Sequence, residues 1–238
     1  MTRKIVVLRI QHNFVEPTNH RLLDELAKFP ELEVHALCPR WGVESGNLRV
    51  LKSSPRSNLS IGRTVFTKHY ATTAYASHLG GMIKSLKPDI INIHDEPYSL
   101  TTGQILFLRS IFSPDSKVVF CSAQNIYKSY PPPFSMIEEW NYRTAAAGYG
   151  CCEGVKEVVR AKGFSGPFEI LPLGLDPELF EFRHRTAVAG RAAVIGFVGR
   201  IVKEKGVFTL LSAFEDVVKH VDARLVFIGS GPDEDHLK

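Results

Sequence analysis

The sequence predicts an α/β fold, in which helices cover both faces of a parallel sheet and the start of a second, incomplete domain follows. Runs rich in valine and isoleucine alternate along the chain with segments of helical periodicity. Most of these runs are short and continuously apolar, which is typical of parallel strands covered on both faces. The alternation stops over 178–192 and then resumes. We therefore expect an N-terminal domain over 1–177, a linker over 178–192 and the beginning of a second domain over 193–238.

Length, composition and charge exclude several classes of protein. The 238 residues are 44% hydrophobic and 23% charged, which excludes collagen-like, disordered and disulfide-scaffold chains. A formal net charge of +4 is too small to indicate nucleic-acid binding. The four cysteines lack the spacing of a metal knuckle or a disulfide framework, so we expect a reducing, cytoplasmic location. No apolar run reaches the ~18 residues of a membrane span, so any contact with the inner face of a membrane would be peripheral.

In the first domain, apolar runs predict the strands, and apolar residues on one face predict the helices. The expected strands are 4–10, 33–38, 90–94, 117–122, 149–152 and 168–171. The expected helices are 20–29, 74–86, 101–111, 135–147 and 155–161. Thr18 or Asn19 is the expected N-cap of the first helix, and Pro88 ends the second because proline cannot extend a helix. The stretch 42–67 is turn-rich, with weak strands and no helix.

The second domain begins with the same alternation. Its expected elements are a strand at 193–198, a basic loop, a helix at 207–220, a strand at 224–228 and a glycine-bearing turn. A single strand–helix–strand unit leaves both sheet edges exposed and encloses too little core to be stable alone. Residues 193–238 are therefore expected to be the truncated start of a domain.

The basic loop of the second domain carries the most informative motif, in the sequence FVGRIVKEKG. Gly199 and Arg200 follow a buried strand, and Lys205 and Gly206 precede the next helix. Ligands of open α/β sheets bind outside the carboxyl ends of the strands, and helix N-termini favour anions. An arginine fork and a lysine point charge together suit a diphosphate. The alternative is an ordinary solvated basic turn.

Together with the helix sequence LLSAF, the strand RLVFIGSGP and the upstream LPLGLDPELF, this motif resembles the family-4 retaining glycosyltransferases of the GT-B fold. In that family a strand ending in Gly-Arg, then Lys-Gly, lies about twenty residues after a turn like Pro-Asn-Gly-Val-Asp. Here the turn runs from Pro172 to Asp176, with Leu173 in place of asparagine and Gly174 retained. The resemblance extends over the whole chain, because PDIINIHDEPYSL and VVFCSAQNIYKSYP also look like N-domain strands that end at a cleft.

The resemblance implies a Rossmann-like, acceptor-side N-terminal domain and a nucleotide-sugar-binding C-terminal domain. It implies transfer of a hexosyl group, with retention, from a nucleotide-diphosphate sugar to a carbohydrate or lipid-linked acceptor, in cell-envelope polysaccharide or glycolipid synthesis. No metal or other cofactor is expected, because Arg200 and Lys205, beside Gly199, would neutralise the leaving diphosphate. The family's Glu-x7-Glu element would lie beyond residue 238, so the chain alone is expected to be inactive.

Two further segments depart from the family pattern. Pro17 and Thr18 stand where members have a Gly-Gly loop after the first strand. Gln124 stands where many members have a histidine at a strand end. Glutamine can position a hydroxyl group but cannot shuttle a proton at neutral pH.

Other polar residues also follow strand ends, where an α/β sheet places its ligands. The candidate catalytic residues are His94 and Gln124. The candidate cleft or acceptor-side residues are His12, Asn13, Asp95, Glu96, Asn125 and Gly174. The alternative for the cluster at 94–96 is a helix cap beside a buried histidine. A zinc site made by His12, His94 and a carboxylate has no supporting ligand spacing.

Aromatic residues flank the proline run at 131–133. Tyr127, Tyr130 and Phe134 could form a lip that stacks on a sugar, or an amphipathic loop packed on the domain.

Two other functions fit the same architecture. A sugar-nucleotide epimerase would interconvert a donor without any acceptor. A non-catalytic module would bind a sugar nucleotide or a partner without catalysing any reaction.

Overall fold

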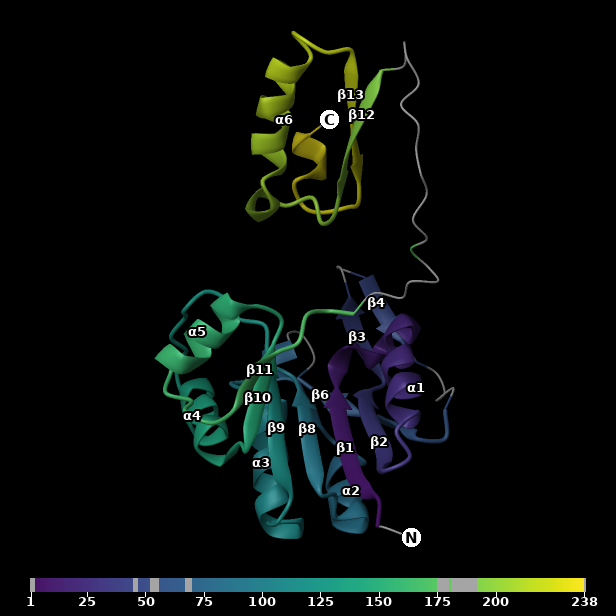
Figure 1. Ribbon diagram of the computed structural model, residues 1–238, viewed down its shortest axis with the longest axis vertical. Coiled ribbons are helices and arrows are strands. Elements are labelled where there is room, and N and C mark those ends of the chain that lie inside the picture. Colours follow the sequence, from purple (N-terminus) through teal and green to yellow (C-terminus); the bar gives the residue numbers. More distant parts are fainter. Residues whose placement is uncertain are drawn as a thin grey trace. The chain divides into compact units, whose positions relative to one another are not determined.

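The computed structural model describes residues 3–44, 47–51, 56–66, 70–174, 180 and 192–237. The chain divides into two compact units, Met1–Gly174 and Leu175–Lys238 (Figure 1). Most of the expected linker, together with the end of the first domain at 175–177 and the last residue, lies outside the described residues.

Unit 1 is built on a seven-stranded sheet whose paired strands are all parallel. The strand order is β11 (Phe168–Ile170), β10 (Ala147–Gly150), β9 (Lys117–Ser122), β8 (Ile90–His94), β1 (Ile5–Gln11), β2 (Leu32–Pro39) and β5 (Leu59–Gly62). The strands from β11 to β2 run from left to right in Figure 1. This order, with the helices that join the strands, is a Rossmann-like α/β fold, so the expected fold class is confirmed.

Two apolar layers hold the helices on opposite faces of this sheet. Residues alternate along a strand between the two faces. Leu8 and Ile10 of β1 pack with Ile83 of α2 (Leu79–Leu86) and Ile105 of α3 (Leu100–Phe112). Val7 points to the other face and packs against the cluster that contains Leu23 of α1 (Arg21–Ala27).

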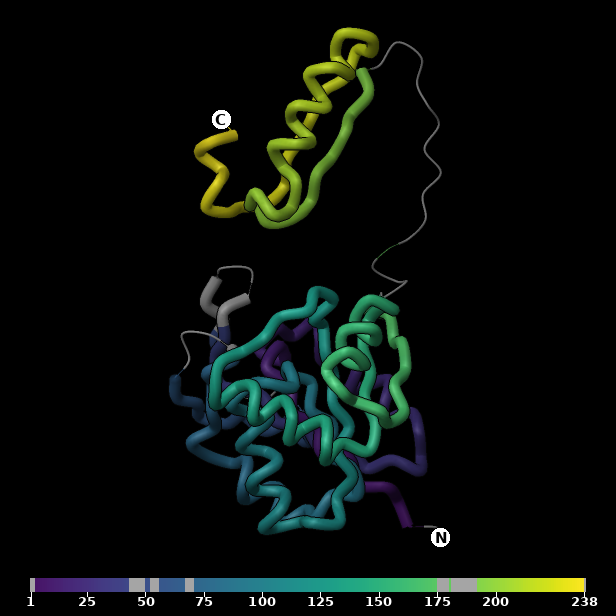
Figure 2. The backbone as a smooth tube through the Cα atoms, turned by 90° about the vertical axis from the view of Figure 1, so that its left-hand side faces the viewer, coloured from purple at the N-terminus to yellow at the C-terminus, as the bar shows by residue number. Residues whose placement is uncertain are grey.

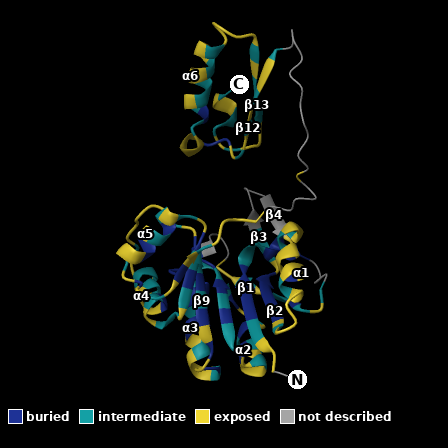
Figure 3. Ribbon diagram, viewed as in Figure 1, coloured by how far each residue is buried: buried dark blue, intermediate teal, exposed yellow. Residues whose placement is uncertain are grey.

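The remaining helices lie beyond β9. They are α4 (Phe134–Thr144) and α5 (Glu153–Ala161). The rings of Phe120 and Phe168 form a third cluster with Val155 and Val159 of α5. In Figure 3 the strands of unit 1 are mostly buried or intermediate, and exposed residues gather on the outer sides of the helices.

Short elements complete unit 1. They are the hairpins β3 (Trp41–Glu44) with β4 (Asn47–Val50) and β6 (Thr64–Val65) with β7 (Ala74–Tyr75), and the 3-10 turns η1 (His12–Val15), η2 (Pro17–His20) and η3 (Tyr70–Thr72). Within the described residues, no helix is both long and apolar enough to cross a membrane.

Two local predictions in unit 1 are wrong. The expected helix at 74–86 begins at Leu79, because the backbone of Tyr75 exchanges hydrogen bonds of 2.8 and 2.7 Å with the Gln104 side chain while β7 pairs with β6. Neither Thr18 nor Asn19 caps α1, since both lie within η2. The side-chain amide of Asn19 instead donates to the backbone carbonyl of Asn13 at 2.7 Å.

Unit 2 has the predicted strand–helix–strand order (Figure 2). Its elements are β12 (Ala193–Val198), η4 (Lys203–Lys205), α6 (Val207–Val217), β13 (Ala223–Ile228) and η5 (Glu234–His236). The two strands are parallel, and α6 ends three residues before the predicted limit at His220. Val194, Val198 and Ile228 are exposed, so this two-stranded sheet has an uncovered apolar surface.

Gly229→Ala should unfold the turn after β13. Gly229 has φ +150°, and a Cβ atom there would lie 1.9 Å from the Gly199 carbonyl oxygen, a backbone atom that cannot swing away. We expect a loss of roughly 2–3 kcal/mol in the local stability of unit 2, measured as faster amide hydrogen exchange. In Gly196→Ala the added Cβ has no atom within 4 Å, so this control should keep its protection. Equal exchange in both variants would contradict the prediction.

Candidate functional site

The carboxyl edge of β1 and β8 is where the sheet of unit 1 changes direction. β1 continues toward α1 and β2 on one side, and β8 continues toward α3 and β9 on the other. Such a switch point is the usual ligand position in an open α/β sheet. The predicted residues His12 and Asp95 meet there, with Nδ1 of His12 in contact with Oδ1 of Asp95. The carboxyl group is 6% exposed and the imidazole 44%, so a buried acid orients an accessible ring.

His94 belongs to a second group of polar residues, which sequence reasoning did not identify. Its Nδ1 lies 3.0 Å from the Tyr149 hydroxyl oxygen. That hydroxyl donates to Asn92 Oδ1 at 3.2 Å, and the guanidinium of Arg9 donates to the same Asn92 oxygen at 2.8 Å and to Tyr149 at 3.3 Å. Arg9 is only 8% exposed and also donates to Gln11 at 2.6 Å. The sequence did contain a signal for this group. Polar residues alternate with apolar ones at the ends of β1 (IVVLRIQ) and β8 (IINIH), which places them on one face of the sheet.

His94 should remain neutral far below pH 6. Burial, the charge of Arg9 and the nearby His12 lower the pKa of His94 from 6.5 to about 3. In the unfolded chain the ring takes up its proton near pH 6.5, whereas the folded chain does not. As the pH falls below about 6, His94 should therefore lower the free energy of unfolding by up to about 1.4 kcal/mol per pH unit. Histidine resonances followed by NMR from pH 7 to 4 test this; a His94 midpoint near pH 6 would contradict it.

Glu96 joins the ends of β8 and β9. It accepts hydrogen bonds from the Ser122 hydroxyl at 3.1 Å and from the Ala123 amide at 3.0 Å. Burial raises the pKa of Glu96, and the adjacent Asp95 raises it further, while the two hydrogen bonds oppose this shift. The backbone amide of Gln124 donates to Ser122 at 3.3 Å. Glu96 therefore holds the loop that carries Gln124.

The other predicted residues of unit 1 lie at varied distances from this edge. Asn13 lies beside the switch point, because its Oδ1 accepts from the amide of Gln11. Asn125 is exposed and follows the loop held by Glu96. Gly174 is the last residue of unit 1, and a Cβ atom there would meet nothing within 4 Å. Leu175 and Asp176, its partners in the interdomain turn, lie outside the described residues.

The loop that carries Tyr127 and Tyr130, before the proline run at 131–133, is anchored to the domain through Tyr130. The ring of Tyr130 stacks on Tyr98 with centroids 3.9 Å apart, and Lys162 Nζ lies 4.6 Å from its centroid. The same lysine forms an ion pair with Glu138 at 2.7 Å, in which the two side chains are 6% and 13% exposed. Tyr127 remains 57% exposed, although Lys162 lies 5.5 Å from its ring.

The basic motif of unit 2 forms the loop between β12 and α6. Gly199 continues the pairing of the strands, since its amide donates to Ile228 at 3.0 Å. Arg200 and Lys205 are both exposed, and neither forms an ion pair within the described part of the chain. Gly206 has φ +73° and is the N-cap of α6, so Lys205 stands directly before a helix N-terminus. The loop therefore combines a positive helix end with two cations that have no ionic partner among the described residues.

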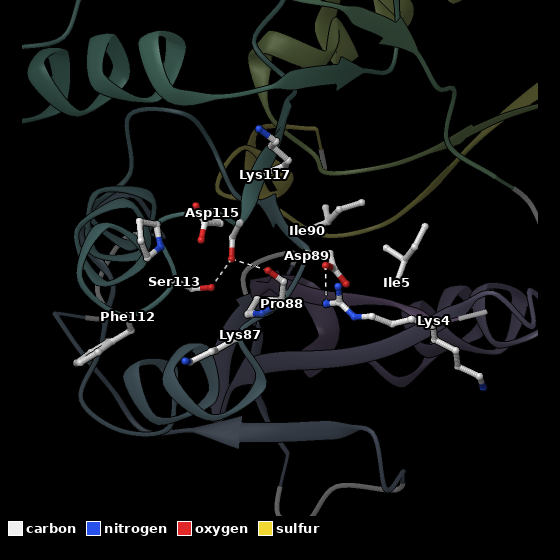
Figure 4. Close-up of a pocket in the computed structure, with 13 residues that line it drawn as sticks. Lys4, Ile5, Lys87, Pro88, Asp89, Ile90, Phe112, Ser113, Asp115 and Lys117 are labelled. Carbon is white, nitrogen blue, oxygen red and sulfur yellow. Dashed lines mark hydrogen bonds and ion pairs between the residues drawn. The ribbon is translucent and has the colours of Figure 1, made fainter. Parts of the chain in front are cut away.

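A cavity of about 750 Å³ lies at the opposite, amino edge of the unit 1 sheet (Figure 4). Lys4, Lys87 and Lys117 line it, and Asp89 there is paired with Arg3 at 2.8 Å. None of the residues predicted from the sequence to form the site contributes to this lining. Among the residues that the structure describes, no group of three His, Cys, Asp or Glu side chains could hold a metal ion.

One family model matches the C-terminal part of the chain. Residues 180–238 match the family described as "Glycosyl transferases group 1". Among curated proteins, none matches the chain.

Solved structures match most of the chain. A UDP-N-acetylglucosamine 2-epimerase has a TM-score of 0.55 at 15% identity, over 96% of this chain and 69% of its own. A putative UDP-N-acetylglucosamine 2-epimerase from Listeria monocytogenes has 0.54 at 17%, over 94% and 62%. The S. aureus MnaA–UDP co-structure has 0.54 at 11%, over 97% and 63%. The chain thus spans about two thirds of the length of these structures. Its C-terminal segment matches group 1 glycosyl transferases, and its fold is that of the UDP-N-acetylglucosamine 2-epimerases.

Proposed function

We propose that this chain is part of a retaining glycosyltransferase that moves a hexosyl group from a nucleotide-diphosphate sugar to an acceptor hydroxyl. The observation that carries the proposal is the loop between β12 and α6. It presents Arg200 and Lys205 without an ionic partner in the described residues, within the segment that matches group 1 glycosyl transferases. Anions bind favourably at such a helix N-terminus.

The chemistry proposed for this loop is stabilisation of the leaving group. The guanidinium of Arg200 would contact two diphosphate oxygens, and the ammonium of Lys205 would add a second charge. The backbone at Gly199 would allow the diphosphate to approach closely. These charges would strengthen their interaction as the bond from the sugar to the diphosphate breaks, which is the condition for catalysis. The proposal includes no metal or other cofactor.

The acceptor is assigned in this proposal to the carboxyl edge of unit 1. His94 and Gln124 would contact the reacting hydroxyl, with His12, Asn13, Asp95, Glu96, Asn125 and Gly174 around them. The acceptor would be a carbohydrate or a lipid-linked sugar of the cell envelope. A cytoplasmic protein with peripheral contact to the inner face of the membrane fits such an acceptor.

A second candidate is a nucleotide-sugar epimerase, because the structural neighbours reported above carry that name. Product analysis by NMR separates the candidates. A form of the protein with a complete donor-side domain is incubated with UDP-N-acetylglucosamine alone, and then with a carbohydrate acceptor added. Conversion of the donor to its C2 epimer without an acceptor supports the epimerase. A new glycosidic bond that keeps the donor's anomeric configuration supports the transferase, and UDP binding without turnover by a form that includes the remaining donor-side residues favours a binding module.

A further inference from the structure

The hydrogen bonds around Tyr149 determine which nitrogen of His94 carries the proton. Arg9 and Asn92 are paired neighbours on β1 and β8, and the Tyr149 side chain reaches them from β10. A guanidinium can only donate. Because Arg9 lies 2.8 Å from the outer amide atom of Asn92, that atom must be the oxygen, since the amide nitrogen would also donate.

The direction of the next hydrogen bond follows. Tyr149 lies 3.2 Å from Asn92 Oδ1, an atom that can only accept, so the single hydroxyl proton of Tyr149 points to Asn92. The Tyr149 oxygen then accepts from Arg9 at 3.3 Å and has a lone pair left for His94. If the hydroxyl proton pointed to His94 instead, lone pairs of the Tyr149 oxygen and of Asn92 Oδ1 would face each other at 3.2 Å. Only one arrangement makes all four contacts hydrogen bonds.

His94 completes the chain as a donor. With the Tyr149 oxygen accepting, Nδ1 of His94, which lies 3.0 Å from that oxygen, must carry the hydrogen. The other nitrogen, Nε2, forms no hydrogen bond within the described residues and is not among their buried unpaired polar atoms. It therefore presents a lone pair to solvent.

We propose that Tyr149, held by Arg9 and Asn92, is a positioning residue that keeps His94 in the Nδ1–H tautomer and so offers Nε2 as a hydrogen-bond acceptor to a sugar hydroxyl. The second half rests on the proposed function, and the first half does not. This assignment makes His94 the residue that orients an acceptor hydroxyl through its lone pair. The cation of Arg9 opposes transfer of the proton to the ring.

The tautomer is measured directly on the 238-residue chain labelled with 15N-histidine. Long-range 1H–15N correlation spectra distinguish a protonated Nδ1 from a protonated Nε2, and His94→Gln assigns the His94 signals. We expect Nδ1 protonated and Nε2 unprotonated at pH 7. A protonated Nε2 in the unmodified chain would overturn the proposal, even if every variant misfolded. The measurement needs no substrate, so failure of the proposed glycosyl transfer would leave it standing.

Two variants then test the role of Tyr149. Tyr149→Phe removes the oxygen that accepts from Nδ1. His94 should then shift toward the Nε2–H tautomer, in which Nε2 donates a hydrogen bond to water. Tyr142→Phe is the matched control, because its hydroxyl lies near Glu138 on α4. An unchanged His94 spectrum in Tyr149→Phe would overturn the role of Tyr149. In a complete enzyme, Tyr149→Phe should reduce kcat more than it raises the KM for the donor.

Discussion

Arg200→Ala is expected to weaken the binding of UDP by roughly 10- to 100-fold. Arg200 is exposed, has no ionic partner in the described residues and follows β12 beside the N-terminus of α6. A hydrogen bond to a charged group contributes about 1.5–3 kcal/mol, and each 1.4 kcal/mol is about a tenfold change in affinity. Isothermal titration calorimetry at low ionic strength measures the change. In a complete enzyme the same variant should lose turnover.

The control is another arginine of the same unit. Arg224 is exposed on β13, at the amino end of that strand, whereas the proposed site is at the carboxyl ends. Arg224→Ala removes the same charge and should change the affinity little. If both variants weakened binding equally, the affinity for UDP would depend only on net charge, which would contradict a specific diphosphate site.

Lys162→Met should lower the free energy of unfolding of unit 1 by about 3–5 kcal/mol. The ammonium of Lys162 lies 2.7 and 3.0 Å from the two carboxylate oxygens of Glu138. Both side chains are almost fully buried, and breaking such a pair leaves a charge without compensation. The substitution also removes the cation–π contact between Lys162 and the Tyr130 ring. Urea unfolding followed by circular dichroism measures the effect.

Two further variants separate burial from charge. In Lys162→Met combined with Glu138→Leu no charge is left unpaired, so most of the lost stability should return. Lys156 and Glu153 form a more exposed pair at 3.5 Å, and Lys156→Met should change stability by less than about 1 kcal/mol. A Lys162→Met variant as stable as Lys156→Met would refute the explanation.

Several strands could be predicted because their sequences are short, mostly apolar runs. The runs at 117–122 and 193–198 coincide with β9 and β12. The helix predicted at 74–86 failed because local periodicity does not include partners distant in sequence. The Gln104 side chain satisfies the backbone of Tyr75, which favours a short strand there.

The candidate site was predictable only in part. The rule that ligands gather at strand ends placed His12 and Asp95 together, and they are in contact. The same rule grouped His94 with Asp95, whereas His94 bonds to Tyr149 instead. Tyr149 is 55 residues away from His94, and no local pattern indicates that its ring crosses β9 to reach Asn92. Such a link depends on the lateral order of strands, which the sequence does not state.

The central claim is that a diphosphate binds at the carboxyl end of β12. Amide 1H–15N correlation spectra of the chain, recorded with increasing UDP, test it most directly. We expect the largest shifts at Gly199, Gly206 and Val207, and their loss in Arg200→Ala. Shifts confined to Lys4 and Lys117, which line the basic cavity at the amino edge of unit 1, would contradict it.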